Sequence, residues 1–91
     1  MTLRYRRHPD LRLAALEGEG VALQLGTRRY FTVSESGVLL FDALTSPRSI
    51  EELVRVLLEE YEVSADQAEA SVRAFLDQCR AAELVASEDA P

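Results

Sequence analysis

Residues 21–33, VALQLGTRRYFTV, decide the fold because they hold two strand-like runs on either side of a short turn. In residues 21–25, large apolar side chains alternate with Ala and Gln, which is the period of a β-strand. Residues 29–33 combine aromatic and β-branched side chains, a composition that favours strands. Residues 26–28 include a Gly and are few enough to join the two runs as a hairpin. The stretch therefore predicts an antiparallel pair of strands.

The sequence before this hairpin predicts one more strand. Apolar residues alternate from Leu11 onward, and residues 17–20 (EGEG) follow as a turn in which Gly can take positive φ. Three strands joined by two short turns make an antiparallel meander, whose last strand, 29–33, is an open edge without Pro. Residues 1–10 are polar and basic and contain Pro9, so we expect a flexible lead-in there.

Three helices are predicted after the meander. Ser34 can cap a first helix, whose apolar residues follow helical spacing until Ser46-Pro47 stops it. Residues 49–52 (SIEE) and 64–67 (SADQ) are capping boxes, which begin a second and a third helix. The expected fold class is α+β: a three-stranded antiparallel sheet followed by three helices, an order that is also winged-helix-like.

The length and composition fit one soluble domain. The chain has 91 residues, of which 47% are hydrophobic and 29% charged, as in ordinary globular proteins. We expect the domain to span residues 11–86 and to end in a polar tail over 87–91. Because no apolar run approaches the ~18 residues that span a bilayer, and no signal-like segment follows the N-terminal Arg residues, we expect a cytoplasmic protein without membrane contact.

Few residues offer chemistry. Cys79 is the single cysteine and His8 the single histidine, so the sequence predicts no internal disulfide, no metal site and no cofactor. A Cys/His nucleophile pair would need His8 to fold onto Cys79, and a buried thiol is the favoured interpretation. The acidic pairs at 51–52 and 59–60 are interpreted as a helix cap and a solvated face. We therefore expect no catalytic residues and no enzyme activity. The sequence leaves the oligomeric state open, and a monomer is favoured.

The charge distribution bears on possible partners. The net charge of −6 divides into an excess of Arg in residues 1–30 and an excess of acids in residues 31–91. Nucleic-acid binding relies on concentrated cations, so an acidic helical half argues against a DNA or RNA ligand. A winged-helix DNA-binding regulator stays the alternative from another functional class, and an acyl carrier is a third candidate that the strands disfavour.

Five stretches of the sequence, taken in order, resemble one family. They are residues 21–25 (VALQL), 29–37 (RYFTVSESG), 41–44 (FDAL), 48–54 (RSIEELV), and 61–64 (YEVS) leading into 72–76 (VRAFL). Together they are similar to the PqqD-like family, the recognition elements for ribosomally synthesised and post-translationally modified peptides (RiPPs). The chain departs from the family pattern at Val33-Ser34, Phe41 and Glu83-Leu84, where the family usually has Leu-Asn, Trp and Gly-Leu.

The resemblance implies a function and a site. Family members bind the leader segment of a precursor peptide as a fourth strand on the third strand of the sheet, with leader side chains in a groove beside the third helix. Carried over to this sequence, the peptide-binding residues are Arg29, Tyr30, Phe31, Thr32 and Val33 on the strand and Val72, Phe75, Leu76 and Cys79 on the helix. The sequence leaves open which face of the strand meets the helices.

The size and the Arg-Tyr-Phe strand resemble the stand-alone proteins of lasso-peptide clusters. That resemblance implies a precursor peptide as ligand and a leader peptidase and a cyclase as partners. The peptide chaperone of pyrroloquinoline quinone biosynthesis is the alternative within the same family.

Overall fold

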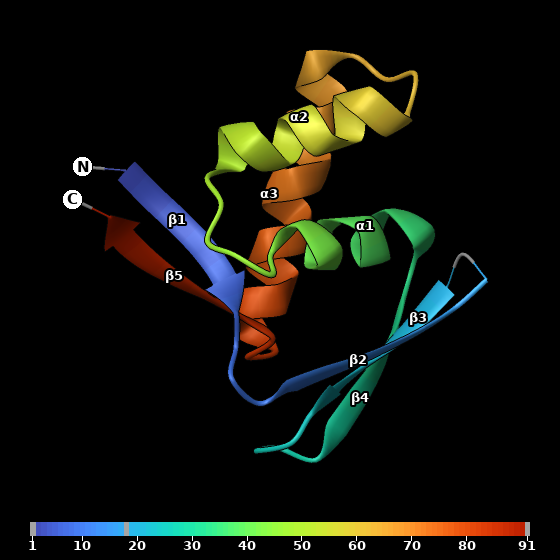
Figure 1. Cartoon of the computed structure of the whole chain (residues 1–91), viewed down its shortest axis with the longest axis vertical. Coiled ribbons are helices and arrows are strands. Elements are labelled where there is room, and N and C mark those ends of the chain that lie inside the picture. Colours follow the sequence, from blue (N-terminus) through green and yellow to red (C-terminus); the bar gives the residue numbers. More distant parts are fainter. Residues whose placement is uncertain (1, 18, 91) are drawn as a thin grey trace.

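The computed structural model describes residues 2–17 and 19–90 of the chain. Its elements run in the order β1 (Thr2–Arg7), β2 (Leu11–Leu16), β3 (Glu19–Gln24), β4 (Arg29–Val33), α1 (Glu35–Ala43), α2 (Ile50–Glu60), α3 (Ala65–Ala81) and β5 (Val85–Ala90). The predicted meander is confirmed, since β2, β3 and β4 form a three-stranded antiparallel sheet in that order. All three helices lie on one side of this sheet (Figure 1). The predicted α+β class is thus confirmed.

The strand register assigns each side chain of the sheet to one of two faces. Leu13, Ala22 and Phe31 lie directly opposite one another across the three strands, and residues in such register share a face. We call the side toward the helices the inner face, made of Leu11, Leu13, Ala15, Gly20, Ala22, Gln24, Arg29, Phe31 and Val33. The opposite side is the outer face, made of Arg12, Ala14, Leu16, Glu19, Val21, Leu23, Tyr30 and Thr32.

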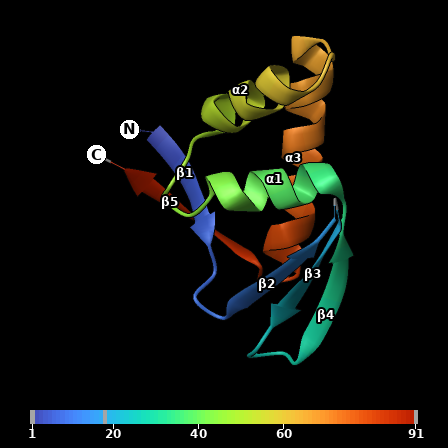
Figure 2. The same cartoon turned by 45° about the vertical axis from the view of Figure 1, so that its right-hand side comes forward.

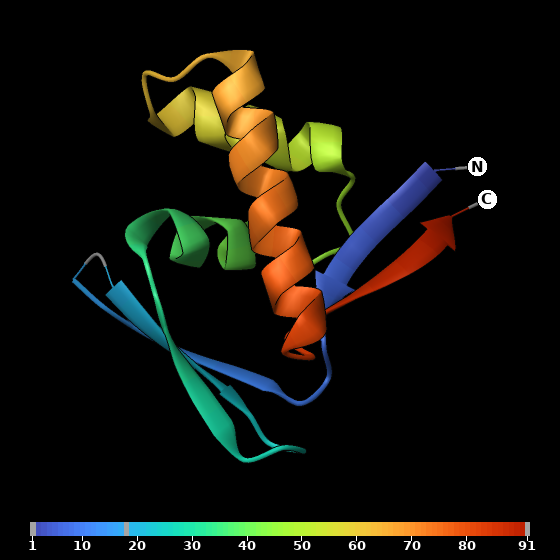
Figure 3. The same cartoon turned by 180° about the vertical axis from the view of Figure 1, so that it is seen from behind.

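Close packing joins the sheet to the helices. A Cβ atom at Gly20 would lie 2.8 Å from Val38 Cγ2, so the missing side chain lets α1 approach β3. The core between the layers holds buried apolar side chains from every helix, the largest of which are Phe41, Leu44, Leu53, Leu76 and Val72. Helix α3 runs from the top of the molecule down to the level of the sheet, which extends below the end of the helix (Figure 3).

The three predicted helix starts are confirmed by their caps. Ser49 Oγ accepts a hydrogen bond from the backbone N–H of Glu52 at 3.2 Å, and Glu52 Oε1 accepts one from Ser49 N–H at 2.9 Å. The hydrogen bond that the Ser49 backbone donates to this carboxylate is the main cause that lowers the pKa of Glu52. Ser64 and Gln67 form the same reciprocal pair, and Ser34 Oγ accepts from Gly37 N–H at 3.3 Å. Local capping chemistry therefore fixes where each helix begins.

A second sheet contradicts the expected lead-in and tail. Strand β1 pairs antiparallel with β5, so residues 2–7 and 85–90 are strands, not a flexible segment over 1–10 and a polar tail over 87–91. Tyr5 is buried, and its backbone exchanges two hydrogen bonds with Arg48 at 2.7 and 2.9 Å. The pairing joins residues at opposite ends of the chain, for which a local sequence pattern gives no signal. Residues 1 and 91 lie outside the described residues.

Candidate functional site

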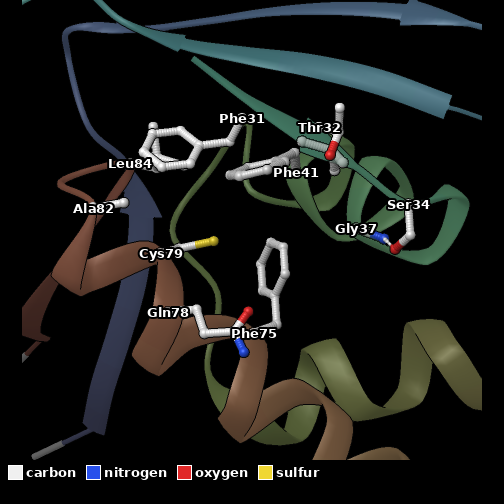
Figure 4. A pocket seen from close by; sticks show the side chains of 11 residues that line it. Phe31, Thr32, Ser34, Gly37, Phe41, Phe75, Gln78, Cys79, Ala82 and Leu84 are labelled. Atoms are coloured by element: carbon white, nitrogen blue, oxygen red, sulfur yellow. Dashed lines mark hydrogen bonds between the residues drawn. The ribbon is translucent and has the colours of Figure 1, made fainter. Parts of the chain in front are cut away.

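A groove lies between the edge strand β4 and helix α3. Its central part is a cavity of about 300 Å³, which is the low end of the range for small-ligand pockets. The walls come from β4, α1, α3 and the segment after α3. The lining residues are Phe31, Thr32, Val33, Ser34, Gly37, Phe41, Phe75, Gln78, Cys79, Ala82 and Leu84 (Figure 4). We call this the β4–α3 groove.

Three aromatic rings give the groove its apolar character. Figure 4 shows Phe31, Phe41 and Phe75 gathered around the cavity, one each from β4, α1 and α3. The Phe41 and Phe75 rings meet edge to face, with centroids 5.0 Å apart. Phe41 is fully buried at the floor, whereas Phe31 and Phe75 are half-buried and keep part of their surface free. The arrangement can hold an apolar side chain, because filling the cavity removes further apolar surface from water.

The groove continues along β4 toward the β3–β4 turn, and past the other end of β4 a further hollow lies between α1, α2 and α3. Toward the β3–β4 turn it is lined by Thr27, Arg29, Phe31, Gln78, Ala81, Ala82 and Glu83. Past Phe75 it is lined by Ser34, Ser36, Gly37, Leu40, Leu57, Ser71, Ala74, Phe75 and Gln78. Adjacent parts share wall residues, so the three hollows form one path. Two of these hollows border β4, an arrangement that suits an extended peptide better than a compact ligand.

Strand β4 offers hydrogen bonds along the same path. It pairs with β3 on one side only, and on the other side no strand of the described part of the chain pairs with it. An unpaired edge exposes a row of backbone N–H and C=O groups that can bind another strand. The apolar hollow and the unpaired edge are therefore adjacent.

Gly37 keeps the groove open where α1 begins. A Cβ atom at this position would lie 2.7 Å from Val33 Cγ1 and 3.6 Å from Phe75 Cε1. The glycine lines both the central cavity and the part beyond Phe75. Any larger residue would press on Val33 or narrow the passage between these two parts.

Gln24 fixes the other end of the groove. This side chain is almost fully buried, and its Nε2 donates a hydrogen bond to the Glu83 carbonyl at 2.9 Å. Its Oε1 accepts from the backbone N–H groups of Gly26 and Thr27. One residue of β3 thus ties the β3–β4 turn to the end of α3, and sets the distance between the two walls.

The turn after α3 carries a left-handed residue. Glu83 has a φ of 59°, and the Leu84 N–H donates to the Cys79 carbonyl at 2.8 Å. With the bond from Glu83 N–H to the Arg80 carbonyl, this is a Schellman motif, which usually has Gly at this position. The motif directs Leu84 into the groove wall.

Cys79 is part of the groove wall and is poorly suited to chemistry. The side chain is buried, and Figure 4 shows its sulfur pointing into the space between the rings. Burial raises the pKa of the Cys79 thiol to about 12, so the reactive thiolate is scarce at neutral pH. Within the described residues, no group of three or more His, Cys, Asp or Glu side chains is placed to hold a metal ion.

The structure divides the predicted peptide-binding residues into three sets. Arg29, Phe31, Thr32, Val33, Phe75 and Cys79 line the groove or its extension. Tyr30 lies on the outer face with 74% of its surface exposed, so only its backbone is on the edge that borders the groove. Val72 and Leu76 are sealed in the core and do not line the groove.

Sequence reasoning missed several wall residues. Gly37, Phe41, Gln78, Ala82 and Leu84 line the cavity but were not among the predicted peptide-binding residues. Ala82 carried a signal, because it continues the helical spacing of Phe75 and Cys79. Gln78 and Leu84 carried no such signal, because Gln78 is polar and Leu84 follows the end of α3.

A family match and two solved structures agree with this fold. Residues 19–85 match the family described as Coenzyme PQQ synthesis protein D (PqqD). The solved structure "TbiB1 in Complex with the TbiA(beta) Leader Peptide" superposes with a TM-score of 0.80 at 28% identity, over 88% of this chain and 93% of that one. "Lasso peptide synthetase B1 complexed with the leader peptide" superposes with a TM-score of 0.73 at 20% identity, over 90% and 96%, and shares the fold. No curated protein matches the chain closely enough to be called a relative.

Proposed function

Because the chain belongs to the PqqD family, as its sequence predicted, we propose that it binds the leader of a ribosomally made precursor peptide in lasso-peptide biosynthesis. One observation carries the proposal: the unpaired edge of β4 lies directly beside an apolar groove. An added strand would use both features at once, with backbone hydrogen bonds to the edge and side chains in the groove. The structural likeness to TbiB1, solved with a leader peptide, supports this use of the site.

The geometry of β4 sets how a leader would bind. An antiparallel fourth strand would place its first residues near Val33 and its later residues near Arg29. Alternate leader side chains would enter the groove, and the largest apolar one would occupy the cavity between Phe31 and Phe75. The remaining side chains would project on the same side as Tyr30.

We propose that the protein performs no reaction itself and presents the leader to a leader peptidase and a cyclase. The titratable side chains that line the groove support a binding role. They are Arg29, Cys79 and Glu83, of which Cys79 is held protonated by burial. A short interface of this kind is compatible with an affinity on the order of 0.1–10 µM.

The family description favours a second candidate, a peptide chaperone of pyrroloquinoline quinone biosynthesis. It would use the same groove and edge for a different precursor.

The winged-helix DNA-binding alternative finds less support. On α3, Arg73 is paired with Glu69 at 3.0 Å, and the helix carries more acidic than basic side chains. In addition, no helix of the described residues is long and apolar enough to cross a membrane.

Calorimetry with a synthetic leader tests the proposal, with the leader taken from any precursor gene found next to the gene of this chain. We expect a one-to-one complex in the micromolar range, while a scrambled leader and a duplex DNA do not bind at 150 mM NaCl. N-methylation of single leader residues should weaken binding with a period of two, because alternate amides face β4. Binding of DNA but not of the leader would reject the proposal. A period of three to four would show that the leader binds as a helix.

A further inference from the structure

Gln78 places a primary amide in the α3 wall of an otherwise apolar groove. The other α3 residues that line the central cavity are Phe75 and Cys79. Gln78 also lines the hollow toward the β3–β4 turn and the hollow between α1, α2 and α3, and no other residue lines all three. Figure 4 shows its side chain extending from α3 on the same wall as Phe75 and Cys79. The amide thus lies at the middle of the groove.

The amide of Gln78 has no role in holding the fold. The two other Gln residues of the chain both do: Gln24 ties the β3–β4 turn to the Glu83 carbonyl, and Gln67 closes the cap of α3. Within residues 2–17 and 19–90, the Gln78 side chain forms no hydrogen bond, and it is exposed to solvent. Its two donor and two acceptor positions are therefore free for a ligand.

A leader that fills the groove would remove this amide from water. Burying a polar group without a hydrogen-bond partner costs free energy, so an amide weakens a site that collects only apolar side chains. An apolar residue at position 78 would serve such a site better. Gln78 favours binding only if the ligand brings a hydrogen-bonding group to the α3 wall.

A strand paired with β4 brings such a group on its second edge. Strand β4 is the outermost strand of its sheet (Figure 2). A leader added to it pairs through one edge, while the alternate N–H and C=O groups of the leader point away from β4. On the far side of the groove stands α3. Because the N–H and C=O of one extended residue point to the same side, a single Gln amide can accept from the first and donate to the second.

We propose that Gln78 is a positioning residue that binds the peptide backbone of the leader, at one residue whose N–H and C=O face α3. This inference rests on the proposed function and adds to it a second backbone contact, on the opposite side of the leader from β4. The contact holds the extended leader between β4 and α3 without selecting a side chain. It requires a leader residue with a free N–H at that point, which excludes Pro.

The test combines leaders that carry a single backbone ester with variants of the full chain. An ester replaces one N–H by oxygen without adding bulk, so it removes one donor. Gln78→Met keeps an unbranched side chain of similar helix propensity but has no amide. Asp77→Met is the control, at an adjacent exposed position of α3 that lines none of the three hollows. Affinities for the unmodified leader and for each ester are measured by calorimetry at 150 mM NaCl.

We expect the esters at amides that face β4 to weaken binding to all three proteins. In the original protein, one ester of the other set should weaken binding at least fivefold more than its neighbours in that set. With Gln78→Met this excess should fall below twofold, and with Asp77→Met it should persist. The unmodified leader should bind Gln78→Met about 5–20-fold more weakly than the original protein, and Asp77→Met within about twofold.

Three outcomes would overturn the inference while leaving leader binding intact. The first is the absence of any sensitive amide outside the set that faces β4. The second is a sensitivity that persists in Gln78→Met, which would assign that amide to another partner. The third is a Gln78→Met protein that binds the unmodified leader as tightly as the original, which would make Gln78 a solvated helix residue. Failure of the original protein to bind the leader would instead reject the proposed function.

Discussion

The two faces of the β2–β3–β4 sheet differ in the size, polarity and exposure of their side chains, although the same three strands form both faces. On the inner face, Ala22 and Gln24 are small or polar, and Phe31 borders a hollow. On the outer face, Val21 and Tyr30 are larger, apolar and exposed, with no covering element among the described residues. The difference shows that the alternation of large and small side chains along a strand does not by itself say which face of the strand is buried. Each prediction below compares one residue of the groove with one of the outer face or a neighbouring surface.

The largest effect is expected from neighbouring residues of β4 that point to opposite faces. Phe31→Thr should weaken leader binding by about 10–100-fold, because a buried Phe ring contributes about 1.5–3 kcal/mol. Tyr30→Thr should change leader affinity by less than about threefold, since its side chain lies on the outer face. Calorimetry on the folded fraction of each variant measures both. Equal losses would show that the leader contacts the two faces alike.

Cys79 provides a second comparison, through its chemical reactivity. Burial raises its pKa to about 12, so its alkylation rate should rise about tenfold per pH unit and not level off between pH 7 and 10. A comparison thiol is introduced on the outer face by Val21→Cys in a Cys79→Ala background. Its alkylation rate should level off near pH 9.

Saturating leader should slow the labelling of Cys79 at least tenfold. The labelling rate of the introduced thiol should stay within about twofold of its value without leader. The ligand-free labelling rate must also exceed the rate of global unfolding, because bound leader slows unfolding as well. Labelling that is no faster than unfolding would place Cys79 in the core and remove it from the groove.

Gly37 tests whether the groove must stay open at α1. Gly37→Ala should weaken leader binding by roughly fivefold, because the added methyl group would lie 2.7 Å from Val33 Cγ1 and close to Phe75. Glu35→Ala, an exposed position in the first turn of the same helix that lines no part of the groove, is the control and should have less than a twofold effect. Thermal melts separate strain from lost binding. A Gly37→Ala protein of lower stability but unchanged affinity would show that the passage accepts a methyl group.

Much of the fold was predictable because its signals are local. The alternation in residues 21–25, the Ser34 cap and the two capping boxes each act over a few residues, and the structure confirms the elements that they predict. The β1–β5 sheet was missed because its strands are largely polar and lie at opposite ends of the chain. No rule of local spacing pairs Thr2 with Ala90.

The site was predictable only in part, since the sequence does not say which face of a strand meets the helices. The apolar period of residues 21–25 predicted a strand correctly, yet its large residues face solvent. On α3, helical spacing identified an apolar stripe but not its depth. Val72 and Leu76 turn into the core, whereas Phe75 and Cys79 reach the groove. Tertiary packing decides that division.

The smallest effect is expected at Arg29, compared with Arg12 on the outer face. The Arg29 guanidinium lies 5.6 Å from the centroid of the Phe31 ring and lines the end of the groove, and it forms no ion pair within the described residues. It should therefore attract a negative charge on the later part of an antiparallel leader. Glu83 lines the same end and opposes this attraction, and exposed ion pairs contribute only about 0.2–1 kcal/mol.

We thus expect Arg29→Gln to weaken leader binding by about threefold at 50 mM NaCl. The difference should fall below about 1.5-fold at 0.5 M NaCl, where exposed charges are screened. Arg12→Gln removes the same charge from the other face of the sheet and should change affinity by less than 1.5-fold at either salt concentration, on the order of the error in such measurements. Affinities for the leader, measured by fluorescence anisotropy at both concentrations, decide the point. A loss for Arg29→Gln that persists at high salt would show that the side chain contributes by packing on Phe31, and not by its charge.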